Sequence, residues 1–313
     1  MTSRRIFSTL ILSTLAAATV VGCGNYSNED LEYMNAVPAA EDISAKIPRA
    51  ALTVNEAELS RDTHAVIKAF NGALDFLDAA DTIRTWPPTT RIPNGRIWGP
   101  WPMNDHPGWQ MRFTMSRDPA APEMFGYRFE VEPIGAGDAG WILFIDGSFV
   151  ATGGGARKGM GTFHMQADGL RNGGFPIGPD GDGNVFKDLT VMYSTAAFPI
   201  SVTMTLQLYA KGDLTNPPLR IDYHYEQQET GQAAMEFSGT DTASGASLSV
   251  QSRWLASGQG RADATATDGT VSGTRTECWN DSFVETYNST PWDTTPGVNY
   301  GDLATGCPDI STL

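Results

Sequence analysis

The sequence predicts a mainly β protein: a large antiparallel sheet curled into a barrel, half-barrel or sandwich of about twelve strands, with one N-terminal amphipathic helix packed on it. Two observations carry this prediction. Apolar and polar residues alternate with a period of two in many segments after Trp86, the pattern of strands with one buried and one wet face. The chain also holds 33 glycines and 19 prolines, which suits many turns. So many strands must curl, close or split into two sheets.

The first residues have the order of an export signal. Arg4 and Arg5 form a positive start, and Ile6–Val21 is apolar or small apart from Ser and Thr. A positive segment, an apolar segment and small residues before a cleavage point are the parts of a secretory signal peptide. The apolar stretch is short for a membrane-spanning helix, which needs roughly 20 apolar residues.

The end of this segment, Val20-Val21-Gly22-Cys23, resembles the lipobox of bacterial lipoproteins. The resemblance covers only the N-terminus and implies that Met1–Gly22 is a signal peptide and that Cys23 carries a covalent lipid as the first residue of the mature protein. Gly24 follows the cysteine where Asp would imply retention at the inner membrane, so the resemblance implies an outer-membrane, lipid-anchored protein. A plain signal peptide with an incidental cysteine is the alternative.

Charge and cysteines restrict the partners and the compartment. The whole chain has a net charge of −15, and an acidic surface disfavours nucleic acid and anionic headgroups. The membrane is therefore expected to be contacted through the lipid. Once Cys23 is assigned, Cys278 and Cys307 remain. In an oxidising compartment such a pair is expected to form a disulfide, which would staple the C-terminal tail onto the last strand.

The mature chain is expected to consist of a lipid-anchored tether, residues 23–52, and a single β-rich domain, residues 53–313. Within the tether, Ser27-Asn28-Glu29-Asp30 is a capping pattern for one short helix through Met34.

The strongest helical pattern covers Asn55–Arg84. Thr53 and Glu56 form a capping box, and Pro87-Pro88 ends any helix before it. One face carries an apolar stripe that must pack on something apolar: Leu59, Val66, Phe70, Leu74 and Leu77.

Clean two-residue alternation predicts strands at residues 109–115, 127–131, 200–208, 219–225 and 248–254. Residues 141–150 are apolar on both faces except at Asp146-Gly147-Ser148, so a central strand is expected there. Alternation is also compatible with a transmembrane β-barrel. The expected lipid anchor, the expected disulfide and the absence of even ten-residue segmentation argue against a barrel.

Catalytic motifs are weak. The four histidines are His64, His106, His164 and His224, and neither His-Glu-x-x-His nor Gly-x-Ser-x-Gly occurs. Four surface histidines are the plainer interpretation. A hydrolase whose triad assembles from distant residues stays open, because triads follow no fixed sequence order.

Two further segments allow a ligand. Asp180, Asp182 and Asn184, with Asp188 nearby, resemble the first half of a calcium loop, but Val185 and Val191 stand where an EF-hand needs Gly and Glu. A glycine-rich turn without metal is favoured. Trp98, Trp101 and Trp109 could stack on sugar rings, although packing in the core is the usual fate of Trp. Gly153-Gly154-Gly155 lacks the spacing of a phosphate loop.

These observations favour a non-catalytic outer-membrane lipoprotein of the cell envelope that binds an apolar ligand, a lipid or a glycan, without a cofactor other than its covalent lipid. An envelope hydrolase is the alternative. A hollow beneath the helix would favour binding, and a cleft joining a histidine, a carboxylate and a serine would favour catalysis.

Overall fold

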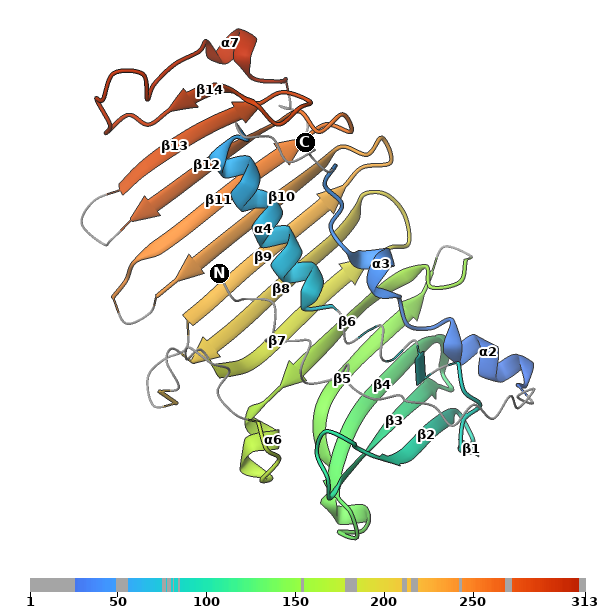
Figure 1. Cartoon of the computed structure of the whole chain (residues 1–313). Coiled ribbons are helices and arrows are strands. Elements are labelled where there is room, and N and C mark those ends of the chain that lie inside the picture. Colours follow the sequence, from blue (N-terminus) through green and yellow to red (C-terminus); the bar gives the residue numbers. More distant parts are fainter. Residues whose placement is uncertain are drawn as a thin grey trace. The chain divides into compact units, whose positions relative to one another are not determined.

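The computed structural model describes residues 26–48, 56–74, 77, 80, 82–83, 85–152, 155–177, 185–209, 213–214, 219–241, 244–267 and 272–309. This part of the chain contains fourteen antiparallel strands, two more than expected, and their order in the sheet is their order in the sequence (Figure 1). The sheet is open, so the mainly β prediction is confirmed without closure into a barrel. Met1–Gly22 and Cys23 lie outside the described residues.

The chain forms two compact units. Unit 1 contains residues up to 44 and residues 72–197, and unit 2 contains residues 45–71 and 198–313. Unit 1 holds the first seven strands, two helices at the N-terminal end and two short helical turns: α2 (Asn28–Met34), α3 (Ala40–Ile43), β1 (Thr90–Ile92), β2 (Gly95–Pro102), β3 (Trp109–Asp118), β4 (Ala121–Pro133), η2 (Asp138–Gly140), β5 (Ile142–Ala151), β6 (Gly159–Gln166), α6 (Asp168–Asn172) and β7 (Val185–Ser194). Unit 2 holds a longer helix and the other strands: α4 (Glu58–Gly72), β8 (Ile200–Tyr209), β9 (Leu219–Gln227), β10 (Ala233–Thr240), β11 (Ser247–Trp254), β12 (Gly260–Thr267), β13 (Ser272–Trp279), β14 (Glu285–Ser289) and α7 (Leu303–Gly306).

The alternating segments fold as predicted, with their apolar residues on the buried side. Phe113 and Met115 of β3, Val202 and Met204 of β8, and Tyr225 of β9 are all buried. In unit 1 the aromatic rings fit over glycines of the next strand. A Cβ built on Gly147 would meet the ring of Tyr127 at 2.3 Å, so the glycine in the predicted central strand makes room for that ring.

The start of the described chain, expected to be a tether, is instead packed in unit 1. The capping box of Ser27 and Asp30 forms as predicted and begins α2, whose Tyr33 is buried, as are Val37 and Ile43 beyond it. A buried apolar side chain contributes roughly 1.5–3 kcal/mol, which explains why this short, polar segment stays on the sheet.

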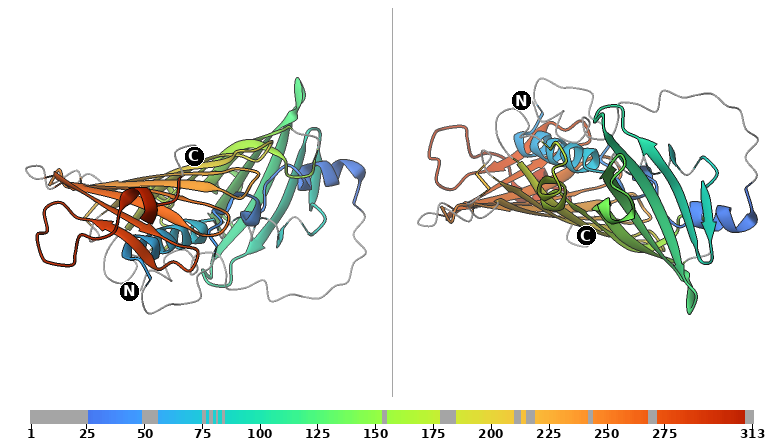
Figure 2. Two further views of the ribbon diagram at one scale, coloured as in Figure 1. Left: turned by 90° about the horizontal axis from the view of Figure 1, so that it is seen from above. Right: turned by 90° about the horizontal axis from the view of Figure 1, so that it is seen from below.

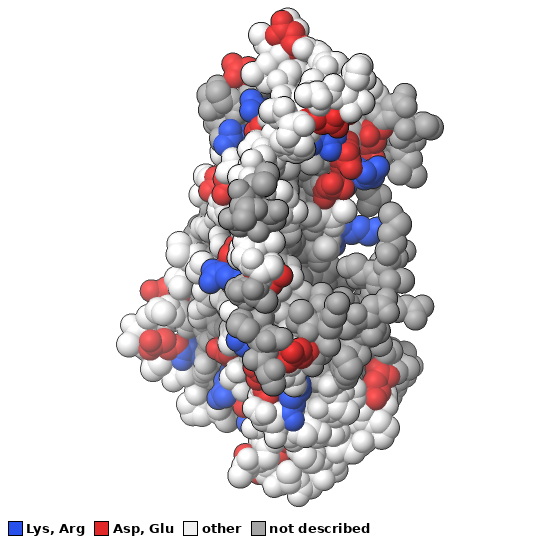
Figure 3. All heavy atoms as spheres, turned by 90° about the vertical axis from the view of Figure 1, so that its left-hand side faces the viewer, with Lys and Arg blue, Asp and Glu red and all other residues white. Residues whose placement is uncertain are grey.

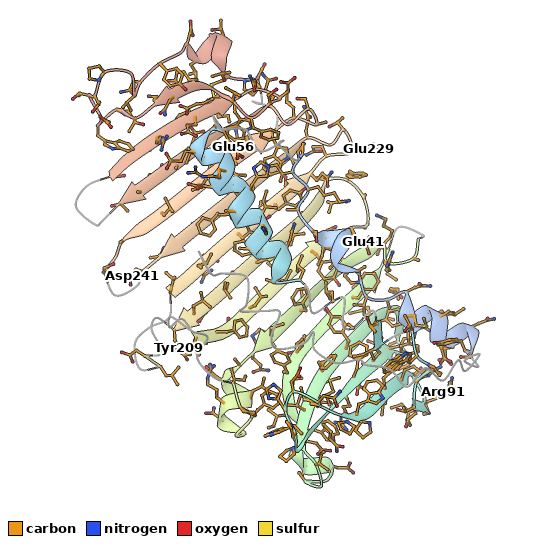
Figure 4. The ribbon with its side chains drawn as sticks, in the orientation of Figure 1. Glu41, Glu56, Arg91, Tyr209, Glu229 and Asp241 are labelled. Carbon is orange, nitrogen blue, oxygen red and sulfur yellow. A yellow bond between two sulfur atoms is a disulfide. The ribbon has the colours of Figure 1, made fainter. Side chains whose placement is uncertain are left out.

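A buried ion cluster holds α2 in place (Figure 4 labels Arg91). Asp30 has no exposed surface and accepts hydrogen bonds from Arg91 at 2.8 Å and from Arg96 at 2.5 Å. Arg96 also lies over the ring of Tyr33 at 4.8 Å. Burial alone would raise the pKa of Asp30, but the hydrogen bonds from Arg91, the Ser27 backbone and Arg96 outweigh it and hold this pKa well below its ordinary value.

The predicted helix Asn55–Arg84 is interrupted: α4 ends at Gly72, residues 73 and 74 form a turn, and the described residues 77, 80, 82 and 83 are helical again. Glycine weakens a helix by roughly 1 kcal/mol, and the Asn71 side chain is held by the Ala45 backbone at 2.9 and 3.0 Å. The predicted stripe is divided accordingly. Leu59 and Phe70 are buried in unit 2, Leu74 and Leu77 are buried in unit 1, and Ile67 takes the buried position expected of Val66.

The predicted disulfide is confirmed: Cys278 of β13 is bonded to Cys307, with their Cα atoms 5.2 Å apart. The tail that it closes covers β14, where Asn288 and Tyr300 exchange backbone hydrogen bonds of 3.1 and 3.0 Å. The otherwise unpaired edge of the last strand is thereby protected from pairing with another chain.

Candidate functional site

Helix α4 crosses the strands of unit 2 on one face of the sheet (Figures 1 and 2). Near its start, the Leu59 N–H donates to the Glu277 Oε2 of β13 at 2.6 Å. In the middle, Thr63 meets Ser252 of β11 at 2.6 Å. Near its end, Phe70 stacks on Tyr223 of β9, with ring centroids 4.2 Å apart. From Leu59 to Phe70 the helix rises roughly 16 Å, and β13 and β9 lie roughly 19 Å apart across the sheet, so one helix face reaches strand after strand.

The pairing register arranges the side chains of this face in rows across the strands. The row beneath α4 is fully buried and consists of Tyr225, Met235, Ser252, Ala262 and Glu277. The next row is buried or partly buried and consists of Met204, Tyr223, Phe237, Val250, Ala264 and Arg275.

A third row lies beyond α4 and remains accessible. We call it the open row: Leu206, Ile221, Gly239, Leu248, Ala266 and Gly273. Its members are partly or well exposed, and Leu248 keeps 42% of its surface. In Figure 4 Tyr209 and Asp241 mark the strand ends closest to this row. Six strands at about 4.8 Å give the row a length of roughly 24 Å.

Small residues make the open row narrow, and an aromatic ring stands at one end. A Cβ built on Gly273 would meet the ring of Trp292 at 2.6 Å, so this ring lies against the backbone of β13. Trp292 nevertheless keeps 58% of its surface exposed. The row is therefore apolar and thin, and it ends at an accessible indole.

A carboxylate cluster lies where the start of α4 contacts β13. Glu277 is fully buried and binds Arg275, which also binds Glu58 of α4 at 2.6 Å. Burial raises the pKa of Glu277 to about 7, and Glu285 and Glu58 raise it further, whereas the Leu59 hydrogen bond and Arg275 lower it. The hydrogen bond from Arg275 lowers the pKa of Glu58.

The histidines named by the sequence stay apart. His164 lies 3.7 Å from Asp146, but Ser148, on the same strand as that aspartate, bonds Thr162 at 3.2 Å. His224 bonds Thr203 at 3.0 Å and lies 3.3 Å from Glu226. Both histidine side chains are 39% exposed on the polar face of their strands, as predicted. Within the described part of the chain, neither is hydrogen-bonded to a serine.

The remaining two histidines pack locally. His64 of α4 lies 2.9 Å from the Ser60 carbonyl oxygen and 3.6 Å from the Glu56 carboxylate. The ring of His106 packs on Phe175, with centroids 4.6 Å apart.

The other predicted ligand sites have mixed outcomes. Asp180, Asp182 and Asn184 lie outside the described residues, while Asp188 lies on β7 opposite Gln166. Among the described residues no group of three or more His, Cys, Asp or Glu side chains is placed to hold a metal ion. Of the tryptophans, Trp98 is fully buried and Trp109 packs on Phe175 at 4.9 Å, while Trp101 meets Trp86 at 5.6 Å.

Comparisons with protein-family models, with characterised proteins and with solved structures find no match for this chain. In the described part, no helix is both long and apolar enough to cross a membrane. Figure 3 shows one face of the molecule, on which basic and acidic side chains are interspersed.

The sequence pointed to three of the six strands of the open row, β8, β9 and β11, but not to the row itself. Alternation assigns Leu206, Ile221 and Leu248 to the apolar face. Which part of that face the helix covers depends on where α4 ends, and that follows from packing.

Proposed function

We propose that the protein is a non-catalytic lipoprotein of the bacterial cell envelope, anchored in the outer membrane through a lipid on Cys23, and that unit 2 holds the acyl chain of a lipid along the open row. The observation that carries the ligand part is the uncovered apolar row across β8–β13. Contiguous apolar surface left accessible on a folded protein can mark a binding site, and this row is contiguous across six strands. The lipobox resemblance carries the anchoring part.

The shape of the row favours a single hydrocarbon chain over a helix or a sugar. A helix is about 10 Å wide, whereas the row is one residue wide and includes Gly239, Ala266 and Gly273. A row of roughly 24 Å matches an extended chain of about 18 carbons, since bonds of about 1.5 Å inclined to the axis advance roughly 1.3 Å per carbon. A sugar would need polar partners beside its aromatic platform, whereas from Gly273, which contacts Trp292, the row continues through the apolar Ala266 and Leu248.

The test is the binding of a fluorescent C18 fatty acid to the purified protein, with two matched variants of β11. Leu248→Asp places a charge on the row, whereas Ser249→Asp places the same charge on the opposite face of the same strand. We expect Leu248→Asp to weaken binding at least tenfold and Ser249→Asp to leave it within about twofold, because a buried charge in contact with hydrocarbon costs far more than an exposed one. Equal effects of the two variants, or no binding by the unchanged protein, would contradict the proposal.

A further inference from the structure

The start of α4 is held on the sheet by apolar packing and by one buried carboxyl group. Ala57 and Leu59 pack with Trp279 and Phe283, and the Ala57 N–H donates to the Phe283 carbonyl oxygen at 3.0 Å. The first N–H groups of a helix have no partner within it, and the Leu59 N–H finds one in Glu277 at 2.6 Å. A carboxylate at this end is also favoured by the helix dipole. Because Glu277 belongs to β13 and Leu59 to α4, this hydrogen bond joins helix and sheet directly.

Charged groups face Glu277 from each element that packs around it. Arg275 comes from the same strand, Glu58 from α4 and Glu285 from β14. Asp62 of α4 lies in the field of Glu58 and Arg275, and Tyr300 of the tail lies in that of Glu285 and Glu277. Arg61 of α4 lies 3.8 Å from Glu58, but its side chain is 61% exposed. Arg275 is the guanidinium that acts on Glu277, and it also binds Glu58, so an ionised Glu277 is only partly compensated.

The middle of the helix–sheet contact supplies little directional bonding. Thr63 and Ser252 form a hydrogen bond there. Ser60 Oγ, Trp254 Nε1 and Tyr223 Oη are buried without a hydrogen-bond partner within the described chain. A buried polar atom without a partner costs roughly 1–3 kcal/mol. The docking of α4 thus depends strongly on its two ends: the Glu277 contact beside the buried Leu59 at one end, and the Phe70 stack at the other.

We propose that Glu277 is a latch whose protonation state sets how tightly α4 docks on the sheet, and therefore how much apolar surface beside the open row is uncovered. The effect on the open row rests on the proposed function. Phe70 of α4 covers the row next to the open row, so looser docking would expose apolar surface continuous with the proposed ligand site.

The direction of the effect follows from linkage. The docked helix keeps the pKa of Glu277 near 7, against an ordinary value of 4.5, so the docked state binds the proton more tightly than an undocked, solvated state. Docking is strongest below pH 4.5 and weakens as pH rises towards 7. One proton changes the equilibrium at most tenfold per pH unit, so the full change is about 300-fold across this window.

The test is hydrogen exchange of the α4 amides between pH 4 and 8, corrected for intrinsic rates and compared with amides of β9 in the same protein. We expect α4 protection to fall by up to about 300-fold between pH 4.5 and 7. Glu277→Gln keeps an acceptor for the Leu59 N–H without a titratable proton, and should remove the fall. Asp62→Asn is the control, because burial also raises the pKa of this neighbouring acid. This variant should keep the fall in protection, because Glu277 still accepts the Leu59 hydrogen bond. A fall that persists in Glu277→Gln, or is lost only in Asp62→Asn, overturns the proposal, as does unchanged protection in the original protein.

A second variant keeps the test decisive if Glu277→Gln does not fold. Glu285 raises the pKa of Glu277, so Glu285→Gln should move the upper end of the fall to lower pH, and an unmoved profile counts against the latch. The affinity of the fluorescent fatty acid is measured over the same range. A fall in protection without any fatty-acid binding upholds the latch and rejects the proposed ligand, so the two proposals fail separately.

Discussion

Phe70→Ala tests whether α4 is an ordinary core helix or a cover beside a binding surface. Only 5% of the Phe70 surface is exposed. Its ring stacks on Tyr223 at 4.2 Å and meets Phe237 edge-on at 6.2 Å. These two contacts attach the end of α4 to β9 and β10.

The expected cost is large. Replacing a buried Phe with Ala costs about 3–5 kcal/mol, and the aromatic stack accounts for roughly 0.5–1.5 kcal/mol of it. At about 1.4 kcal/mol per factor of ten, the folding equilibrium of unit 2 falls by roughly two to three and a half powers of ten. Since Phe237 borders the open row, the same change uncovers apolar surface that is continuous with that row.

The assay pairs urea unfolding with the fluorescence of an apolar dye under native conditions. Phe149→Ala is the matched control, because Phe149 is equally buried but lies in the core of unit 1, over Gly159. Both variants should unfold at lower urea, and only Phe70→Ala should bind more dye while folded. A loss of stability without extra dye binding would show that α4 is an ordinary core helix, and would refute the idea that it covers apolar surface beside the open row.

Three further changes test other parts of the molecule. Cys23→Ala should move the protein from the membrane pellet to the soluble fraction, and a variant that still pellets in high salt would exclude the lipid anchor. Cys307→Ser opens a loop of 29 residues and should cost about 3–4 kcal/mol in the free energy of unfolding; denaturing, non-reducing thiol labelling of the original protein should find Cys278 and Cys307 unreactive. Asp30→Asn leaves the buried Arg96 with only the half-exposed Glu29 as its carboxylate partner, at 2.6 Å, and should cost up to about 3–5 kcal/mol. In the original protein the pKa of Asp30 is lowered, so the contribution of Asp30 to the free energy of unfolding is complete above about pH 4 and is lost as pH falls. Hydrogen exchange of the α2 amides during acid unfolding would measure this loss.

Local patterns were sufficient where the cause of the structure is local. The period of two placed Phe113, Val202 and Tyr225 on the buried face, because a strand offers only two faces and one of them is wet. The Ser27–Asp30 capping box began α2 at the expected residue, since the two groups that satisfy each other lie three residues apart. The disulfide followed from compartment and parity alone.

Contacts distant in the sequence were not predictable in the same way. Asp30 has the appearance of a capping residue in an acidic segment, and its burial depends on Arg91 and Arg96, about sixty residues later. Glu277 has the appearance of an ordinary acid in a weakly alternating strand. Its buried state depends on Leu59, 218 residues earlier. A carboxyl group gives no local sign that it is buried, because only its partners make burial tolerable.

The end of α4 shows how a small local feature decides the site. A helix over Asn55–Arg84 would be about 45 Å long, whereas the seven strands of unit 2 span roughly 29 Å. Such a helix could not remain in contact with them along its length. Helix α4 instead ends at Gly72 after 15 residues. Its length of roughly 22 Å is enough to reach from β13 to β9. Its width covers two rows of side chains and leaves the third accessible. If the helix lay one row further along the strands, Leu248 would be buried and Glu277 would face solvent, so the open row and the proposed latch have the same origin in the placement of α4.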